Sequence, residues 1–589
     1  MVSVVRRKFD SVTGQISFKL MRRRDYLPGI MISAAVIASI AVFTLLVTIV
    51  WLSFVDGSPG DDDLAYTFGH YASIFLDDFT YQVIINTLMF SSITLLVALS
   101  LGLPMAWIIE RTDFPGKPIV FTMFTIALLI PGFSVALGWV FLLHPRIGIV
   151  NQALMTLFGL EEAPFNIATI LGMGMVEGLS LTPVTFIMTA IVFRAMDPSM
   201  EEAAAMGGAN LRERMRRVTL PLAWPGILAA SIYVFAIGFA AFDVPAIIGL
   251  PQRIFTFSTY VYSEISPADG LPEYGGVAGL SVIMVLFAVA LTWWYNSVQR
   301  NSSRYAVVTG KAYRPTLVEL GRYKIPVICL FVIFFTLSQA VPVLTLLWGA
   351  GLPFLQPVSA AAIAQLSFNN FTSLPGDLVF SGIQNTGMLM ILVPTITVAL
   401  SLGISWVVLR SKVPGRSIFD FFAFLPHTIP SIVFSVAAWL LALFVLSDFI
   451  PIYGTIWILV LVYVIARLSY GTRMTNTGMI QIHKELEESA RMSGASSGGV
   501  MRGVVIPLLT PAMMYAWIWI ALLTYRELTL PVVLSTGDNQ PLSMVVWSLV
   551  LTSEYGHASA VAVIMMALMI PILILYWVIV RRTQIVPTS

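Results

Sequence analysis

The chain has 589 residues, of which 58% are hydrophobic and only 11% are charged, and its mean hydropathy is +0.87. Soluble globular proteins carry about 25% charged residues, so this composition excludes a string of soluble domains. The formal net charge of +2 indicates little before its distribution is known. The single cysteine, Cys329, excludes an intrachain disulfide and a cysteine-based metal cluster.

Twelve apolar runs follow one another along the chain, and each is long enough to cross a hydrocarbon core as a helix of about 20 residues. We therefore predict an all-α membrane protein with twelve transmembrane helices. The first run is too long for the apolar part of a cleavable signal sequence, so it is expected to be retained. The predicted spans lie near 30–54, 83–109, 118–142, 167–195, 222–249, 275–298, 324–349, 384–409, 417–446, 450–472, 511–535 and 557–580.

Positive charges are distributed unevenly between the segments that join these spans. If the N-terminus lies in the cytoplasm, 30 of the 33 Lys and Arg residues fall in or beside cytoplasmic segments. Only Arg146, Arg253 and Arg526 fall elsewhere, and the first external segment is rich in aspartate. An excess of Lys and Arg marks the cytoplasmic side of a membrane protein. We therefore predict that both termini are cytoplasmic.

The two halves of the chain carry the same landmarks in the same order. Asn86-Thr87 and Pro131 recur 299 residues later as Asn385-Thr386 and Pro430, and farther along each half the offset becomes 286 residues. Each repeat holds six spans, an even number, so the repeats are predicted to be parallel. The predicted division is a cytoplasmic segment 1–29, a first permease unit 30–298, a cytoplasmic linker 299–323, a second permease unit 324–582 and a cytoplasmic tail 583–589.

A short motif occurs once in each half, after the fourth and after the tenth predicted span. In both copies a glutamate precedes a glycine by six residues, and the glycine precedes a proline by 13 residues. The first copy comprises Glu202, Ala203, Ala204, Gly208, Leu220 and Pro221, and the second comprises Glu488, Ser489, Ala490, Gly494, Ile506 and Pro507.

The first copy of the motif predicts two short helices joined by a turn. Glu202-Ala203-Ala204 lies among good helix formers. Gly208 can adopt the positive backbone angle that turns the chain, and Asn210 can cap a second helix over 211–218. Leu220-Pro221 is expected to end that helix before the next span begins. The result would be a helix–turn–helix that lies parallel to the membrane.

This motif resembles the EAA loop of ABC importer permeases, and both copies keep the family's spacing. The resemblance implies the type I ABC importer permease fold and a bacterial inner-membrane location. In that family the loop sits in a groove of an ATPase subunit, where its glutamate pairs with a basic residue. Two loops imply two ATPase subunits, as a homodimer, and a periplasmic solute-binding protein that delivers the solute. The second copy departs from the pattern at Ser489, which leaves open whether both loops bind equally tightly.

The chain contains no Walker A motif. Gly310-Lys311 is followed by Ala312 and lacks the upstream glycine that a phosphate-binding loop requires. We therefore expect that the chain binds no cofactor and is not an enzyme, and that ATP and Mg²⁺ are bound by the partner ATPase subunits. The five histidines are scattered and predict no metal site, and the expected surroundings are a lipid bilayer and no nucleic acid.

Three features resemble the bacterial ferric-iron permeases of the binding-protein-dependent transport system inner membrane component family. They are the fusion of two halves, the recurring Asn-Thr and Pro-Gly landmarks, and the sequence Tyr525-Arg526-Glu527-Leu528. This resemblance favours ferric iron as the solute. Similar permeases import thiamine, polyamines or 2-aminoethylphosphonate, and these alternatives stay open. An ion-coupled secondary transporter would explain the repeat and the intramembrane charges, but not the two matched loops.

Four ionisable residues fall inside predicted spans, where such residues are candidates for function by default. Glu177 interrupts the fourth span, Asp243 lies near the outer end of the fifth, and Arg526 and Glu527 lie in the outer half of the eleventh. We predict that they line the translocation path or form its outer gate. The alternative is that they pair with neighbours and fix helix packing.

Overall fold

The computed structural model describes residues 26–57, 65–267, 271–302 and 317–583, so most of the predicted N-terminal segment and tail lie outside the described residues. Within these ranges the chain is almost entirely helical, and the only sheet is the ribbon of β1 (Val55–Asp56) and β2 (Ala65–Tyr66). Ten of the described helices are long and apolar enough to cross a membrane, or twelve spans form if each of two bent helix pairs is counted as one. The predicted all-α membrane fold is confirmed.

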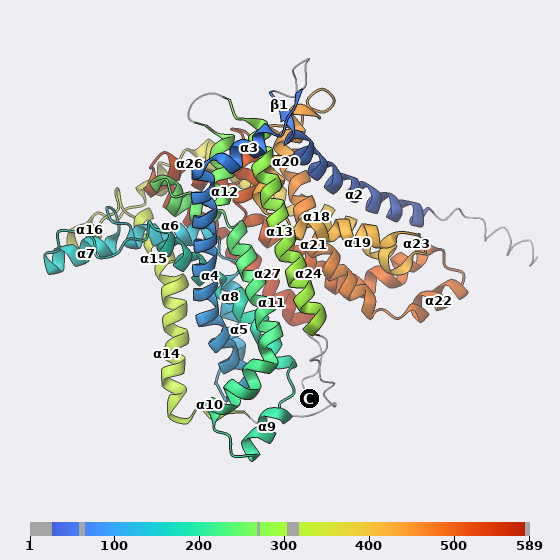
Figure 1. Cartoon of the computed structure of the whole chain (residues 1–589), viewed down its shortest axis with the longest axis horizontal. Helices are drawn as coiled ribbons and strands as arrows, with labels where there is room; N and C mark the ends of the chain where they lie inside the picture. The colour runs from blue at the N-terminus through green and yellow to red at the C-terminus, as the bar shows by residue number, and fades with distance from the viewer. Residues whose placement is uncertain (1–25, 58–64, 268–270, 303–316, 584–589) are drawn as a thin grey trace, which may run out of the picture.

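The first half of the molecule is built around the long helices α4 and α8, which pack along their lengths (Figure 1). A Cβ on Gly178 of α8 would lie only 2.6 Å from the Val97 Cβ of α4, so the missing side chain permits this close approach. The elements of this half are α2 (Leu27–Leu52), α3 (Gly69–Leu76), α4 (Asp78–Arg111), α5 (Lys117–Ala127), α6 (Gly132–Leu143), α7 (Ile149–Phe158), α8 (Ile170–Ala195), α9 (Ser199–Met206), α10 (Leu211–Arg214), η1 (Met215–Thr219), α11 (Leu220–Ala240), η2 (Pro245–Gly249), η3 (Leu250–Gln252), α12 (Phe257–Ile265) and α13 (Tyr274–Ser302).

The second half repeats this arrangement with α18 and α21 as its central pair. Its elements are η5 (Gly321–Tyr323), α14 (Lys324–Phe335), η6 (Thr336–Ala340), α15 (Val341–Ala350), α16 (Ala360–Ala364), α17 (Asn369–Thr372), α18 (Gly376–Arg410), α19 (Arg416–Phe424), η7 (Leu425–His427), α20 (Ser431–Phe444), α21 (Ile456–Gln481), α22 (Lys484–Met492), α23 (Ser497–Val500), η8 (Met501–Val505), α24 (Ile506–Tyr525), α25 (Thr529–Leu534), α26 (Leu542–Leu551) and α27 (Tyr555–Thr583).

The recurring Asn-Thr landmark has the same structural role in both halves. The Thr87 hydroxyl of α4 accepts a hydrogen bond of 2.8 Å from the Phe257 amide at the start of α12. The Thr386 hydroxyl of α18 accepts one of 2.8 Å from the Leu542 amide at the start of α26. Matched helices thus carry matched contacts, and the predicted pair of parallel six-helix repeats is confirmed.

Each half contains one helix pair that bends sharply at a proline. The pair α5 and α6 bends by 90° beside Pro131, and the pair formed by α19–η7 and α20 bends by 107° beside Pro430. Proline has no N–H donor and its ring clashes with the preceding turn, so a helix breaks there. Such breaks free backbone groups, which other spans must satisfy within a membrane.

The first helix of each half lies against the other half. The helix α2 packs against α18 and α20, while α15 packs against α6. On α14 the ring of Phe335 lies 4.8 Å from that of Phe124 on α5, centroid to centroid. The two repeats therefore interlock in space, since each one places its first helix on its neighbour. The bounds 30–298 and 324–582 of the two units stay a prediction.

The described end of the linker, residues 317–323, runs beside the loop between α4 and α5. The Asp113 amide donates a hydrogen bond of 3.1 Å to the Val318 carbonyl. The Asp113 carboxylate accepts a hydrogen bond of 2.8 Å from the Leu320 amide. The Lys324 ammonium lies 2.8 Å from the Asp113 carboxylate and, with that amide, holds the pKa of Asp113 below its usual range. This junction fixes where the second half begins relative to the first.

Two predicted spans end earlier than expected. The fifth and eleventh were expected to reach 249 and 535, but α11 ends at Ala240 and α24 ends at Tyr525. Pro245 and Pro531 follow these ends, and each would remove a backbone donor from a continuing helix. Short separate segments, η2 and α25, replace the expected helix ends.

Candidate functional site

We call the two copies of the motif (202–221 and 488–507) the docking loops after their predicted role. The helix α9 carries Glu202-Ala203-Ala204 of the first docking loop. Gly208 follows with φ of +84°, a left-handed conformation that glycine adopts without strain. The Asn210 side chain accepts a hydrogen bond of 2.9 Å from the Glu213 amide, and the Glu213 carboxylate accepts one of 3.1 Å from the Asn210 amide. The predicted turn and cap are confirmed, and the cap is a reciprocal capping box.

The second docking loop has the same path with a weaker cap. The helix α22 carries Glu488-Ser489-Ala490, and Gly494 turns the chain with φ of +86°. The Ser496 hydroxyl accepts a hydrogen bond of 3.2 Å from the Gly499 amide. Gly499 occupies the position of Glu213 and has no side chain to return the bond, so this loop makes only half of the capping box.

The prediction that Leu220-Pro221 ends the second helix of the loop is wrong. The segments α10, η1 and α11 form one continuous helix, Leu211–Ala240, and the second half matches it with Ser497–Tyr525. In each half a π-helical turn precedes the proline, as η1 before Pro221 and η8 before Pro507. A π-helical turn spans one more residue per hydrogen bond than an α-helical turn, so it shifts the hydrogen-bond register of the helix. The proline, which has no N–H donor, is then accommodated without a break in the helix. The second helix of each loop is therefore the first part of a membrane span.

A methionine projects from the same position of both loops. Met206 ends α9 and is 85% exposed, and Met492 ends α22 and is 90% exposed. Single exposed apolar side chains are common on protein surfaces, but the recurrence of one at the same position of both loops makes these methionines candidates for a contact with a partner. The sequence argument missed both, although their matched spacing behind the glutamate was a usable signal.

A buried ion pair ties the second docking loop to the end of α18. Arg410 Nε lies 2.6 Å from Glu487 Oε1, and these side chains are only 8% and 7% exposed. Arg410 Nη2 also donates to the carbonyls of Met479 (2.9 Å) and Ile482 (2.8 Å) at the end of α21. Separating a buried pair leaves an uncompensated charge, so this contact holds α18, α21 and α22 in one arrangement.

The first docking loop carries the equivalent pair in a looser form. Arg111 Nε lies 3.8 Å from Glu201 Oε2, and Arg111 Nη2 donates to the Met196 carbonyl at 3.2 Å. Glu201 instead accepts a hydrogen bond of 2.7 Å from the Thr219 hydroxyl. Arg111 and Arg410 are equivalent residues, 299 positions apart, but their carboxylate partners lie far along the chain and were not predicted.

A cavity of about 970 Å³ lies between the two halves. Its walls come from α8, α11 and α13 of the first half and from α21, α24 and the bend before α20 of the second. It extends from Asp243 and Thr529 to Asn296 and Arg473, which lie in the parts of α13 and α21 nearest the docking loops. In Figure 1 these loops lie at the bottom (α9, α10) and at the right (α22, α23), away from α7 and α16.

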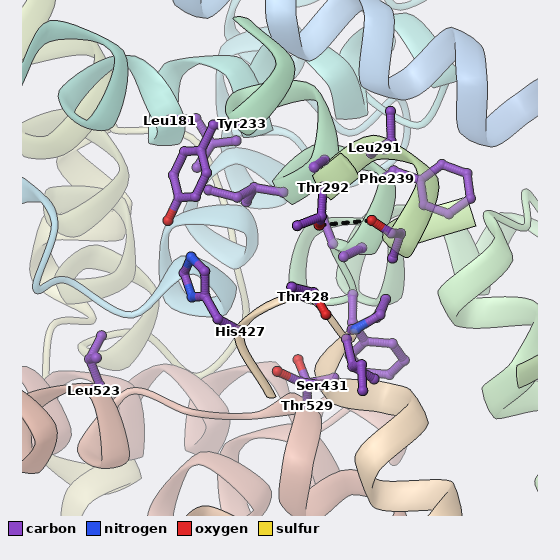
Figure 2. A pocket seen from close by; sticks show the side chains of 18 of the residues that line it. Leu181, Tyr233, Phe239, Leu291, Thr292, His427, Thr428, Ser431, Leu523 and Thr529 are labelled. Atoms are coloured by element: carbon purple, nitrogen blue, oxygen red, sulfur yellow. Dashed lines mark hydrogen bonds between the residues drawn. The ribbon is translucent and has the colours of Figure 1, made fainter. Parts of the chain in front are cut away.

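Aromatic side chains line the part of the cavity nearer the docking loops. The rings of Tyr233 and His427 stack at 5.9 Å, and His427 meets Tyr470 edge-on at 5.5 Å. Figure 2 shows Tyr233, His427 and Thr428 around the same cavity. The break beside Pro430 presents His427 to the cavity. The sequence argument missed these aromatic residues because they form no motif along the chain.

Five charged side chains line the opposite end of the cavity: Glu177, Asp243, Arg467, Arg526 and Glu527. Arg467 forms an ion pair with Glu527, and both side chains are mostly buried. Arg526 donates to the Leu128 carbonyl, which the bend between α5 and α6 leaves free. The assignment of Arg467 to a cytoplasmic segment is wrong, because α21 continues to Gln481 and Glu527 neutralises the arginine within the span.

The cavity ends at the axis that relates the two repeats. Asp243 and Thr529 are equivalent residues, 286 positions apart, and the Thr529 hydroxyl donates to Asp243 Oδ1 at 3.3 Å. Equivalent residues meet only at such an axis. The Asp243 carboxylate also lies at the start of α6, where a Cβ on Gly132 would be 3.3 Å from Asp243 Oδ2. The amino-terminal end of a helix favours a negative charge.

All four predicted path residues, Glu177, Asp243, Arg526 and Glu527, therefore line one end of one cavity. Arg526 and Glu527 also have partners that fix the packing, as the alternative expected. Their role in transport stays a prediction. In the part of the chain that the structure describes, no group of three or more His, Cys, Asp or Glu residues could hold a metal ion.

Residues 98–304 and 395–585 match the family model described as binding-protein-dependent transport system inner membrane component. The chain belongs to this family. Each match contains one docking loop and the helices that line its side of the cavity. The chain is thus a multi-pass membrane protein and a permease component of an ABC importer, and such components are not themselves enzymes.

Two similar proteins span most of the chain. The ferric transport system permease protein FbpB of Actinobacillus pleuropneumoniae is 26% identical over 521 residues, which cover 86% of this chain and 72% of that protein. A putative ferric transport system permease protein, FbpB 1 of Haemophilus influenzae, is 26% identical and covers 79% and 72%. The molybdenum transport system permease protein ModB of Escherichia coli is 23% identical over 38% of this chain and 97% of its own length. Nearly the whole of that permease therefore corresponds to less than half of this chain.

Proposed function

We propose that the chain carries ferric iron across the bacterial inner membrane, receives it from a periplasmic binding protein, and is driven by two ATPase subunits docked on α9 and α22. The matched docking loops support the docking of two identical subunits. Similarity to two ferric transport permeases supports iron as the solute. Thiamine, polyamines and 2-aminoethylphosphonate are the alternative solutes.

The docking surface of each loop combines one glutamate with one methionine. Glu202 or Glu488 would pair with a basic residue in the ATPase groove, and Met206 or Met492 would fill an apolar depression beside it. The alanines and Ser489 keep the helix narrow enough for close approach. An aromatic or apolar anchor beside a charged contact is the usual composition of a strong interface centre.

The continuous helices supply the coupling. Leu211–Ala240 has 30 residues, so it reaches about 45 Å from the docking loop toward Asp243. The second half matches it with Ser497–Tyr525, which ends beside Arg526 and Glu527. When bound ATP draws the ATPase subunits together, these helices would carry the displacement to the Asp243–Thr529 contact and open it. The described state, with its cavity on the loop side of that contact, would be inward-facing.

Charge supports the proposed orientation in the membrane. Four arginines lie within the first docking loop: Arg212, Arg214, Arg216 and Arg217. Positive charges of this density favour the cytoplasmic face and its anionic lipids. Both docking loops and both termini would therefore be cytoplasmic.

Transport by the purified complex tests this function. The chain would be purified with its ATPase, reconstituted in liposomes with the iron-loaded binding protein, and assayed for uptake of radioactive iron. We expect uptake that requires ATP and the binding protein and is blocked by vanadate. Iron uptake driven by an ion gradient without ATP would favour a secondary transporter. ATP-driven uptake of thiamine, a polyamine or 2-aminoethylphosphonate, but not of iron, would replace the proposed solute.

A further inference from the structure

Glu177 differs from the other charged side chains at the end of the cavity. It lies in α8, is 8% exposed and lines the cavity. No hydrogen bond or ion pair joins its carboxylate to another residue in the described ranges, although Asp243 and Arg526 lie within electrostatic range. The Ser180 hydroxyl, one turn along α8 and also on the cavity wall, is buried without a hydrogen-bond partner. Two neighbouring polar groups are thus left unsatisfied on one wall.

The charges at this end of the cavity do not balance. Three carboxylates, Glu177, Asp243 and Glu527, face two guanidinium groups, Arg467 and Arg526. One carboxyl group therefore has no arginine to pair with inside a membrane span, where it must either hold a proton or pair with a cation. The remaining arginine of the cavity wall, Arg473, lies nearer the docking loops, is half exposed and pairs with Asp420 at 3.6 Å. A metal cation that enters the cavity would take the place of that proton.

The surroundings of the two arginines argue against an anionic ligand. Arg467 is held by Glu527, and Arg526 is held by the Leu128 carbonyl. Both guanidinium groups also lie near carboxylates, Arg467 beside Glu527 and Arg526 within electrostatic range of Glu177 and Asp243, so an anion at either one would meet a negative charge. Among the residues that line the cavity, the groups without a hydrogen-bond partner include the Glu177 carboxylate and the Ser180 hydroxyl, which are oxygen ligands, and the Arg467 Nε donor.

Oxygen ligands select hard metal cations over soft ones. Glu177 and Ser180 come from α8, and Asp243 comes from the segment after α11, so the three approach one wall of the cavity from two elements. Two carboxylates and one hydroxyl leave several coordination positions to water, and a cavity of about 970 Å³ has room for it. A transported ion must leave its site again, and conduction therefore requires sites that bind weakly. A site with only three protein ligands meets this requirement.

We propose that Glu177, Asp243 and Ser180 form a transient site for a hard multivalent metal cation, stripped of organic ligands, at the end of the cavity next to the repeat axis. The inference rests on the proposed function and deepens it, since the site would hold the iron after its release from the binding protein. Tyr463 occupies the position of Glu177 in the second half, so the site is single and lies off the axis.

Binding of terbium tests this site without requiring transport. The probe is Tb³⁺ alone, added to the detergent-solubilised complex of the chain with its ATPase, and binding is read by Tb³⁺ luminescence. Loss of an outer-shell group typically lowers metal affinity about 10–100-fold, so removal of a direct ligand should lower it by at least about tenfold. We expect that loss for Glu177→Gln and a smaller loss for Ser180→Ala. The matched control Glu161→Gln alters an exposed carboxylate outside the cavity and should bind as the unaltered chain does.

Two outcomes would overturn the site. One is an unaltered complex that does not bind Tb³⁺, and the other is a Glu177→Gln complex that elutes as an intact complex and binds Tb³⁺ as tightly as the unaltered chain. Glu177→Asp, which keeps the carboxylate, should retain measurable binding and so separates ligand loss from misfolding. Iron uptake in liposomes separates the two proposals: normal uptake by Glu177→Gln contradicts the site and leaves the iron function standing. Absent uptake by the unaltered complex contradicts the iron function, and Tb³⁺ binding still decides the site.

Discussion

The docking ends of the two halves are near copies of each other, whereas the cavity walls between them differ. Both loops have a left-handed glycine, an exposed methionine and an arginine–glutamate pair beneath the docking helix. At the cavity, Tyr463 stands where the first half has Glu177, and Leu181 stands where the second half has Arg467. The two regions come from the same duplication but have diverged to different extents.

This difference indicates which parts of the permease need to be symmetric for its function. Two copies of one ATPase would need two similar surfaces, so the docking positions stay matched. A single solute held beside the axis, between unlike halves, meets different groups on its two sides, so the lining is free to diverge. The predictions below test whether the matched region behaves symmetrically and the unmatched region does not.

The largest effect is expected at the Arg467–Glu527 ion pair of the cavity, which has no equivalent in the first half. Glu527→Ala leaves Arg467 buried without a counter-charge, which should destabilise the protein by about 3–5 kcal/mol. The double variant Glu527→Ala/Arg467→Met removes both charges, so its stability should return close to that of the unaltered chain while transport stays impaired. Thermal unfolding of the purified complex measures the first, and iron uptake measures the second. Equal stability of the single and double variants would show that the pair does not matter.

The second effect compares the ion pairs beneath the two loops. Arg410→Ala strands the buried Glu487 and should cost about 3–5 kcal/mol, whereas Arg111→Ala leaves Glu201 with the Thr219 hydroxyl and should cost less than half as much. The measurements are the unfolding temperature and the amount of ATPase that stays bound. Arg146→Ala, which removes an exposed arginine, serves as the control. Equal losses for both variants would mean that the two loops are anchored alike.

The third effect tests the symmetry of the turns. Gly208 and Gly494 have nearly the same positive φ, so Gly208→Ala and Gly494→Ala should each cost about 1–2 kcal/mol in the loop. Gly207→Ala is the matched control, because Gly207 has a negative φ and space for a methyl group. Hydrogen exchange of the loop amides should rise in the first two variants only. A rise in one loop alone would break the symmetry.

The smallest effect concerns the weaker cap of the second loop. Glycine is about 1 kcal/mol less favourable than alanine inside a helix, and a Cβ on Gly499 would meet its neighbours at an ordinary 3.5 Å. Gly499→Ala should therefore stabilise the start of α23 by up to about 1 kcal/mol and slow hydrogen exchange there. The amides of the first loop should be unaffected. If hydrogen exchange at the start of α23 does not slow, helix propensity does not limit the stability of this loop.

Local patterns predicted much of the fold and half of the candidate site. Hydropathy identified the twelve apolar runs, and equal spacing identified both docking loops with their turn at Gly208 and cap at Asn210. The same local reasoning failed at Pro221, because a π-helical turn carries the helix past the proline. It also failed at Arg467, because an arginine near the end of a predicted span is assigned to the membrane surface unless its partner within the span is known.

The sequence by itself determined the class, the repeat and the docking loops of this protein, since these depend on hydrophobicity, spacing and the conformational limits of single residues. Only the tertiary structure decided which charges meet at the cavity. The pairs Arg467–Glu527 and Thr529–Asp243 join segments that are 60 and 286 residues apart. Their contact depends on how the two halves interlock around an axis, and the same packing leaves the Glu177 carboxylate facing the cavity.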